Sequence, residues 1–381
     1  MALRPASVTM QQPERFSGVV HVFSRMDPGG AELRTISVLE QTELTFDFLA
    51  MSGSGTLDLA LEGDGHRVFT ASMSIGGLVR AARVIGRNHY VVVHSHLGPA
   101  SGPILFVAAL LGVPVRVAHF RSDGVGGRKS ILRSLRLVVS RALVALCATK
   151  IIGVSPGALS RGWRRGWAKD PRCSVIPNGM DARLLRERAR GGIARRPDME
   201  DRFVVANIGR AEPSKNRARA IRIWAELASA RTSTLVLVGP MNELDRPHID
   251  AARARILPSS EIIETGESTD VPGHLGMAHV LLVTSLREGL PGVVLESLAV
   301  GVPVVSSRLP GTTWIAEQLE GIAVCGLEED DEVWVRALEE VVVSADSHAI
   351  RASFDSGPFT LEGAVPAFAA LWKLDEVGGR R

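Results

Sequence analysis

Two glutamates in the second half of the sequence, Glu288 and Glu296, are separated by seven residues. Glu296 falls inside an otherwise apolar stretch that should form a helix, and a buried carboxylate is costly unless it has partners. We interpret it as a ligand for two neighbouring hydroxyls, such as those of a ribose, because one carboxylate can accept from both. A solvated helix face is the alternative, and the apolar side chains around Glu296 fit it poorly.

Glu288 leads into a Gly-Leu-Pro-Gly turn, which leaves unpaired backbone N–H groups at the start of the next helix, where they complement phosphate. Earlier in the chain, Gly209 and Arg210 follow a predicted strand, and Lys215 stands five residues further on. Ser214 is the predicted N-cap of the helix that follows. Arg binds phosphate as a fork and Lys as a point charge, so this pair suits a diphosphate. Two solvated surface cations are the alternative interpretation.

Glycine and histidine residues follow several strands predicted in the first half. The first strand leads into a turn at Gly29 and Gly30, where backbone N–H groups can approach a phosphate or a sugar closely. Later strands end at His94, His96 and His119. Each of these signals is weak alone, since most such glycine turns are ordinary loops and most single histidines are packed or solvated. Their coincidence at one sheet edge indicates a ligand cleft.

Short β-branched runs alternate with segments of helical period, a pattern typical of parallel α/β folds. In the first half, strands are predicted at residues 19–24, 46–51, 67–69, 91–96, 113–120, 151–154 and 175–176, and helices at 31–40, 77–87, 102–111 and 130–148. In the second half, strands are predicted at 203–208, 234–238, 261–263, 280–285, 302–306 and 322–325, and helices at 216–230, 291–300, 313–320 and 331–344. Residues 183–202, rich in Arg and Gly, are predicted to be an inter-domain linker. The fold class expected is α/β, with two doubly wound Rossmann-like domains facing a central cleft.

Composition excludes several classes of protein. The 381 residues carry 44 basic and 41 acidic side chains, a net charge of +3, and a single tyrosine, so no basic and aromatic patch indicates nucleic-acid binding. Three widely spaced cysteines indicate neither a disulfide framework nor a zinc site. The sequence shows no signal peptide and no membrane-spanning run, so we expect a cytoplasmic protein that is soluble or at most peripheral.

With these residues in place, the sequence resembles the retaining glycosyltransferases of family four, in the GT-B group. Glu288 and Glu296 match the E-x7-E signature of that family, and Gly209-Arg210 with Lys215-Asn216 resembles its diphosphate-binding element. Residues 175–181 resemble the segment that closes its N-terminal domain. Residues 23–32 and 46–49 further resemble the branch that builds exopolysaccharide and capsule chains, and the whole match spans residues 19–372.

The resemblance implies an N-terminal acceptor domain at 1–190, a donor domain for the nucleotide sugar at 200–358, and a C-terminal helix within 359–381 that crosses back to the first domain. It also implies transfer of a hexose or N-acetylhexosamine from a nucleoside diphosphate sugar, for example a UDP-sugar, to a saccharide, lipid-linked or natural-product acceptor. Transfer would proceed with retention and without a metal or other cofactor. The only metal motif to consider, Asp330-Asp331, is better explained as the solvated first turn of a helix.

Roles follow by position from the same resemblance. Glu296 would hold the ribose, Arg210 and Lys215 would neutralise the departing diphosphate, and His119 would lie near the donor sugar. The residues implied in catalysis are His119, Arg210, Lys215 and Glu288. Those implied in donor binding are Gly29, Gly30, Gly209, Arg210, Lys215, Glu288, Gly289, Leu290, Pro291, Gly292, Val293 and Glu296. The sequence departs from the family at His279, where Asp is common, at Asn216, where Gly is frequent, and in the turn at 310–313.

Other functions remain open at this point. A nucleotide-sugar epimerase of the same fold is one alternative, and a sugar-binding protein without catalysis is another. A dinucleotide oxidoreductase is disfavoured because Gly53-Ser54-Gly55 continues to Asp58 where the fingerprint requires Gly.

Residues 128–172 combine basic and apolar side chains with two tryptophans, a composition suited to peripheral contact with anionic lipid headgroups. We favour an ordinary amphipathic helix followed by an exposed loop, because its apolar side would also have to cover the sheet.

Overall fold

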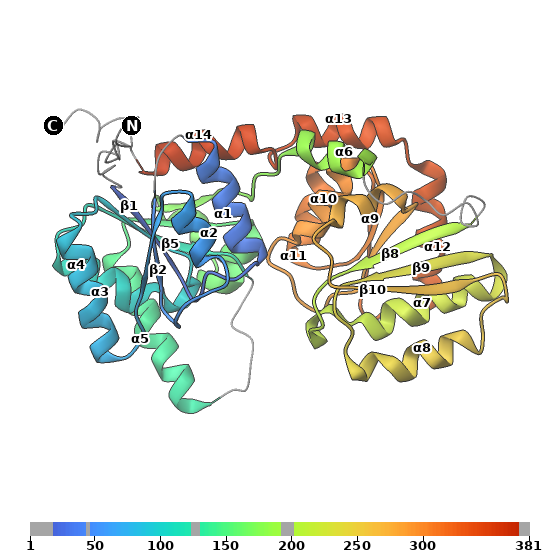
Figure 1. Ribbon diagram of the computed structural model, residues 1–381, viewed down its shortest axis with the longest axis horizontal. Coiled ribbons are helices and arrows are strands. Elements are labelled where there is room, and N and C mark those ends of the chain that lie inside the picture. Colours follow the sequence, from blue (N-terminus) through green and yellow to red (C-terminus); the bar gives the residue numbers. More distant parts are fainter. Residues whose placement is uncertain (1–17, 43–45, 123–129, 192–201, 373–381) are drawn as a thin grey trace, which may run out of the picture.

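The chain folds into two parallel α/β sheets, as the computed structural model shows for residues 18–42, 46–122, 130–191 and 202–372 (Figure 1). The first sheet has seven strands in the order β3-β2-β1-β4-β5-β6-β7 and the second has six in the order β10-β9-β8-β11-β12-β13. Strand order reverses beside the first strand of each sheet, which is the arrangement of a doubly wound fold.

The first sheet comprises β1 (Val19–Phe23), β2 (Asp47–Ala50), β3 (Arg67–Thr70), β4 (Val92–Ser95), β5 (Val115–Phe120), β6 (Lys150–Gly153) and β7 (Cys173–Val175). Its helices are α1 (Gly30–Glu40), α2 (Asp58–Gly63), α3 (Ile75–Arg87), α4 (Gly102–Leu110) and α5 (Ile131–Cys147). Central strands such as β1 and β4 are buried along their whole length, because helices cover both faces of a parallel sheet.

The second sheet comprises β8 (Phe203–Ile208), β9 (Ser233–Val238), β10 (Glu261–Gly266), β11 (Val280–Val283), β12 (Val304–Ser307) and β13 (Ile322–Cys325). Its helices are α7 (Arg217–Ala230), α8 (Arg246–Arg253), α9 (Val271–Met277), α10 (Gly292–Val300), α11 (Pro310–Gln318), α12 (Asp331–Ser344) and α13 (Ser347–Ser356). The short helices α2, α8 and α9, and helix α13, are absent from the sequence prediction.

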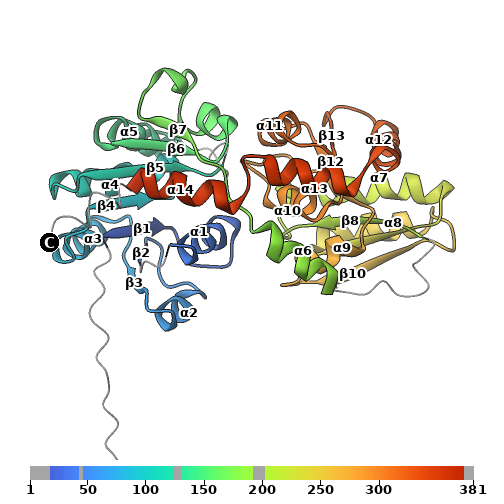
Figure 2. The same ribbon diagram turned by 90° about the horizontal axis from the view of Figure 1, so that it is seen from above.

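A last helix, α14 (Leu361–Trp372), returns to the first sheet, and Figure 2 shows it lying over that half while α13 lies over the other. Phe368 and Trp372 are buried against the first sheet in one apolar cluster with Val19, Phe23 and Phe48. The segment before α14 is hydrogen-bonded to the segment that leads from the first half into the second. The N–H of Met180 donates to the carbonyl of Phe359 at 2.9 Å. The last helix therefore belongs to the core of the first half.

The predicted linker at 183–202 is wrong over its first part. Residues 182–191 form helix α6 (Ala182–Gly191), whose Ala182 and Leu185 are buried with side chains of the second half such as Leu275 and Leu295. Two buried residues are enough to dock a helix whose other positions are mostly charged. The rest of the predicted linker, 192–201, lies outside the described residues.

Ser214 is not the N-cap of a helix as predicted. Residues 213–215 form a short 3-10 turn, and Asn216 precedes α7 in the left-handed conformation with φ of 51°. Asn is one of the few residues other than Gly that tolerate this conformation, which explains how it can stand where the family often has Gly.

Candidate functional site

The loop between Glu288 and α10 lies where the two halves touch, at the carboxyl ends of β5 and β6. The hydroxyl of Ser155, just beyond β6, donates to the carbonyl of Gly289 at 2.9 Å. A Cβ at Gly289 would overlap the carbonyl oxygen of Arg121, just beyond β5. Only glycine permits this approach, so the contact itself explains one glycine of the predicted donor loop.

The structure brings two of the predicted site residues, Lys215 and Glu288, into direct contact. The Nζ of Lys215 lies 2.7 Å from Oε1 of Glu288, and the hydroxyl of Ser285 donates to the same oxygen at 2.8 Å. The aliphatic part of Lys215 passes 3.5 Å from the position a Cβ would take at Gly209. The ammonium is thus held in place by a carboxylate before any ligand binds.

Arg210 does not join this pair. Its side chain is 71% exposed, and it lies 3.2 Å from Glu212 in a surface ion pair. It also lies near Glu32 of α1. Burial raises the pKa of Glu32, while the charges of Arg121 and Arg210 act in the opposite direction. Arg210 is therefore a largely exposed cation that acts on Glu32 of the first half only electrostatically.

Glu296 has a partner that the sequence analysis did not foresee. Arg34 of α1 donates to its Oε1 across the boundary between the halves, and the side chain of Glu296 is only 15% exposed. The pairing satisfies the buried carboxylate, which confirms that Glu296 does not lie on a solvated helix face. A pair of ligand hydroxyls that binds Glu296 must share this carboxylate with Arg34 or displace the Arg34 side chain from it.

Helix α10, which carries Glu296, begins at Gly292 with Pro291 as its N-cap residue, so its first N–H groups face the Glu288 loop. Leu290 is buried beside it and Val293 is half-buried. The helix ends at Gly301, which adopts φ of 95° in the left-handed region that closes many helices.

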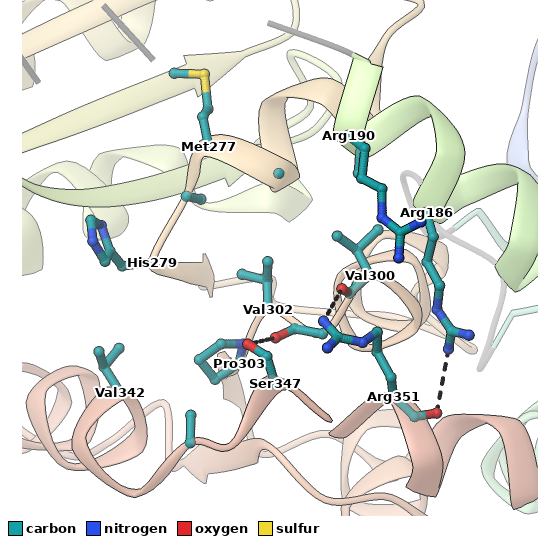
Figure 3. Close-up of a pocket in the computed structure, with 15 residues that line it drawn as sticks. Arg186, Arg190, Met277, His279, Val300, Val302, Pro303, Val342, Ser347 and Arg351 are labelled. Carbon is teal, nitrogen blue, oxygen red and sulfur yellow. Dashed lines mark hydrogen bonds between the residues drawn. The ribbon is translucent and has the colours of Figure 1, made fainter. Parts of the chain in front are cut away.

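A cavity of about 680 Å³ lies at that far end of α10, before the amino ends of β11 and β12 (Figure 3). Arg186 of α6 donates to the carbonyl of Ala299 at 2.7 Å, and Arg351 of α13 donates to that of Val300 at 3.4 Å. Two cations at the carboxyl end of a helix satisfy its last carbonyls and complement its dipole. The cavity therefore lies beside the C-terminal end of α10. Glu288 lies at the opposite edge of the sheet, beyond the carboxyl end of β11.

The two glycines after β1 lie at the start of α1. Gly29 is its N-cap residue and Gly30 its first residue, and a Cβ at Gly30 would meet no atom within 4 Å. Open space in front of a helix N-terminus is compatible with the predicted approach of a ligand, and Glu32 in the first turn lies against Gly29.

His119 lies in a buried cluster of four histidines on one face of β1, β4 and β5. His94 Nε2 lies 3.1 Å from His119 Nδ1, and His96 Nε2 lies 3.0 Å from His21 Nδ1. Trp372 Nε1, which can only donate, bonds His94 Nδ1 at 3.0 Å. Because His94 Nδ1 accepts from Trp372, the proton of His94 lies on Nε2 and is donated to His119 Nδ1. The proton of His119 therefore lies on its own Nε2.

All four histidines are neutral. Burial lowers the pKa of His21 to about 3, with smaller contributions from Arg121 and His66. Burial also holds the pKa values of His94, His96 and His119 well below 6.5. Nitrogens of His21, His94 and His96 lie within 4.8 Å of one another, the spacing of a metal ligand set. The adjacent Arg121 cation and the nitrogens already engaged as acceptors make this a hydrogen-bonded row that fits a metal poorly.

Arg121 is the functional candidate that the sequence analysis missed. Its Nε donates to His96 Nδ1 at 3.0 Å, Nη1 to Asn178 at 3.1 Å and Nη2 to Thr35 of α1 at 2.6 Å. Burial lowers its pKa to about 10, and Glu32 acts in the opposite direction. Its place directly after the strand that carries His119 was the available signal.

The apolar face of α5 was expected to cover the sheet, but much of it is exposed. Instead of covering the sheet, six of its large apolar side chains are exposed: Ile131, Leu132, Leu135, Val138, Val139 and Leu146. Ile131 is 91% exposed, and Arg136 lies among them on the same helix. Among the described helices, none has the length and apolar character needed to cross a bilayer.

Comparison with known proteins agrees with this architecture. A family model described as "Glycosyl transferases group 1" matches residues 202–343. The putative glycosyltransferase EpsF of Bacillus subtilis is 28% identical over 341 residues, which cover 84% of this chain and 86% of EpsF. The capsular polysaccharide biosynthesis glycosyltransferase CapH of Staphylococcus aureus is 25% identical, covering 85% of this chain and 90% of CapH.

Among solved structures, HepE of Anabaena in complex with UDP superposes with a TM-score of 0.73 at 17% identity, covering 94% of this chain and 99% of HepE. Sucrose-phosphate synthase of Thermosynechococcus elongatus superposes with a TM-score of 0.68 at 16% identity, covering 95% and 99%. These likenesses give the fold as GT-B, with its two facing parallel sheets. Residues 202–343 thus match the group 1 glycosyltransferases, and the chain is a glycosyltransferase that uses a nucleotide sugar.

Proposed function

We propose that this enzyme transfers a hexose or N-acetylhexosamine from a UDP-sugar to a saccharide acceptor, with retention and without a metal or other cofactor. The observation that carries the proposal is the ion pair of Lys215 and Glu288 in the loop that leads to the N-terminus of α10, the helix whose Glu296 pairs with Arg34 of the first half. HepE, which shares the fold, has been solved with UDP-glucose, and this supports uridine as the first nucleotide to test.

In the proposed reaction, the bond between the anomeric carbon and the donor phosphate breaks, and its electron pair leaves with the diphosphate. Lys215 and Arg210 neutralise that charge, and the N–H groups of α10 bind phosphate oxygens. The acceptor hydroxyl forms the new bond on the same face, and its proton passes to the departing phosphate. Because the chain's own cations perform the charge stabilisation, no divalent ion is required by the proposal.

The remaining predicted residues take roles that fit their surroundings. Glu296 binds the ribose after exchanging its bond to Arg34, and Glu288 orients Lys215 and the backbone of residues 289–293. Gly29 and Gly30 leave room for the donor phosphate and the acceptor. His119 offers its Nε2 proton, which has no partner among the described residues, to the donor sugar.

We propose a lipid-linked saccharide as the acceptor. A galactosyltransferase of Escherichia coli, 24% identical over 253 residues, is named for an acceptor on diphosphoundecaprenol. An acceptor held in a membrane calls for a docking surface, and the exposed apolar face of α5 with Arg136 suits anionic headgroups. Localisation in the cytoplasm, with peripheral contact at the inner face of the membrane, remains a prediction.

Cosedimentation with vesicles tests this docking. Binding to vesicles of phosphatidylglycerol and phosphatidylcholine should exceed binding to phosphatidylcholine alone, and should fall with added salt. Leu135→Ser should weaken it, whereas Leu59→Ser, at a leucine on α2 that is even more exposed, should not. Equal binding of both variants would contradict the role of α5.

The transferase activity is tested by incubating the protein with UDP-, GDP- and TDP-sugars and following nucleotide release and product. Glu296→Ala should abolish detectable binding of the preferred donor, whereas Glu62→Ala, at an exposed glutamate on α2, should not change it. Epimerised sugar without any acceptor would favour the epimerase instead. Saturable donor binding with neither hydrolysis nor transfer would favour a sugar-binding protein.

A further inference from the structure

The guanidinium of Arg121 is a charge held rigidly among neutral partners. Thr35, His96 and Asn178 come from three separate segments, and each accepts one of its N–H groups. A guanidinium has five N–H groups, so two remain, one on each terminal nitrogen. These two can reach oxygens of a single anionic group.

Among the described residues, no carboxylate lies within ion-pair distance of Arg121. Taking a charge out of water without an opposite charge is costly, so a buried arginine normally has a carboxylate partner. The partners of Arg121 instead fix its orientation, and Glu32 acts on its charge only from beyond ion-pair distance. An anionic ligand would supply the missing charge.

The surroundings of Arg121 are the elements expected to hold the donor diphosphate. Its backbone lies against Gly289 in the loop that leads to α10. Its Nη2 is bonded to α1, the helix whose start at Gly29 is predicted to face phosphate. Glu32 lies in the electrostatic field of both Arg121 and Arg210. These contacts favour the diphosphate over an anionic group elsewhere on the acceptor.

We propose that Arg121 binds the β-phosphate of the nucleotide donor and is a third cation for the leaving group, supplied by the first half of the molecule. The inference rests on the proposed function, since it requires a nucleoside diphosphate in the cleft. As the anomeric bond breaks, the electron pair goes to an oxygen of the β-phosphate, and the two remaining N–H groups of Arg121 stabilise that charge. Thr35, His96 and Asn178 are positioning residues for this guanidinium.

Titration calorimetry with nucleoside diphosphates and monophosphates tests the proposal. UDP and UMP differ only in the β-phosphate, so Arg121→Gln should weaken UDP binding by roughly tenfold to a hundredfold and leave UMP binding nearly unchanged. Glu296→Ala should weaken both ligands, because both contain the ribose. Arg116→Gln is the matched control, since Arg116 lies on the same strand but bonds backbone carbonyls at its other end.

Each outcome decides the matter. Equal loss of UDP and UMP in Arg121→Gln, or unchanged UDP binding with a raised KM for acceptor, would overturn the proposal. If Arg121→Gln does not fold, Arg121→Lys is the second variant, because lysine keeps the positive charge but lacks the two parallel N–H groups of a guanidinium. This variant should bind UDP several-fold more weakly than the wild type and bind UMP equally well. The expected factor corresponds to the loss of one charged hydrogen bond. If the wild-type protein binds none of UDP, GDP and TDP, it is the proposed function that fails.

Discussion

The single ammonium at the site is already oriented in the ligand-free protein. Lys215 is one of only five lysines in the chain, and its ammonium donates to an oxygen of Glu288 that also accepts from the hydroxyl of Ser285. A cation that is positioned before the reaction costs no reorganisation when charge develops on the leaving group. The arrangement explains why Glu288, the first glutamate of the pair, is close to the chemistry although it is itself negatively charged.

Removing that ammonium should affect the rate more than the fold. Lys215→Met is expected to lower kcat for sugar transfer by roughly a hundredfold, since one donor to a developing anion typically contributes that much. Lys150→Met, at a half-buried lysine on β6, should keep the wild-type rate. Steady-state kinetics with the preferred donor would measure both, and equal rates in the two variants would contradict the role of Lys215.

The buried histidines make a second prediction at this scale, on stability against pH. Their pKa values are lowered in the folded protein, so each stays neutral when folded and takes up a proton on unfolding once the pH is below about 6.5. Stability should therefore be complete above that pH and fall as the solution is acidified, by about 1.4 kcal/mol per pH unit for each histidine.

His21→Phe should flatten this dependence, because the ring sits among Phe46, Phe48 and Trp372 and an uncharged phenyl ring takes up no proton. Urea unfolding between about pH 4.5 and pH 7.5 would measure the slope. His348→Gln, at an exposed histidine on α13, is the control and should leave it unchanged. An identical slope in all three proteins would show that the row of histidines does not govern acid sensitivity.

At the scale of elements, the loop from Glu288 to α10 makes a close backbone contact between the two halves. Its backbone touches the first half only because residue 289 has no side chain. Gly289→Ala would push this loop away from Arg121, and we expect at least a tenfold loss in kcat/KM, since small displacements of positioned groups are costly in catalysis. Gly76→Ala, where a Cβ meets nothing within 4 Å at the start of α3, is the matched control and should keep full activity. Kinetics on the two variants would decide.

The elements could be predicted to different degrees, for physical reasons. The buried strands of both sheets were found because runs such as β11 are continuously apolar. Helix α6 was mistaken for a linker because it buries only Ala182 and Leu185 and owes its docking to tertiary contacts, which local composition does not reveal. The direction of the apolar face of α5 also depends on packing, and the sequence alone suggested that it covered the sheet.

At the scale of the whole molecule, the sequence indicated which loops carry the candidate residues but not the contacts between the two halves. Parallel strands must end at a common edge, so Lys215, Glu288 and Glu296 could be placed there from their positions after strands. Arg34 and Glu296 are 262 residues apart, and nothing local to either one indicates the other. The same holds for Arg121, whose partners lie in three separate segments and are brought together only by the complete fold.

The return of α14 to the first sheet makes a prediction about stability. Trp372 is 1% exposed in the core of the first half, so Trp372→Ala should lower the free energy of unfolding by about 3 to 5 kcal/mol. Hydrogen exchange should show the loss in β1 and β4, although the substitution lies near the other end of the chain. Val343→Ala, at an 89% exposed position on α12, is the control and should cost little. Loss of protection confined to the second sheet would contradict this account.

The same helix also sets the order in which the protein can be finished during synthesis. Residues 19–23 leave the ribosome long before Phe368 and Trp372, the side chains that cover them. The second half has all of its strands and helices once residue 356 has emerged, and it can fold while the first half still has an apolar surface uncovered. A nascent chain stalled before residue 361 should therefore engage chaperones through its amino-terminal half, the part translated earliest.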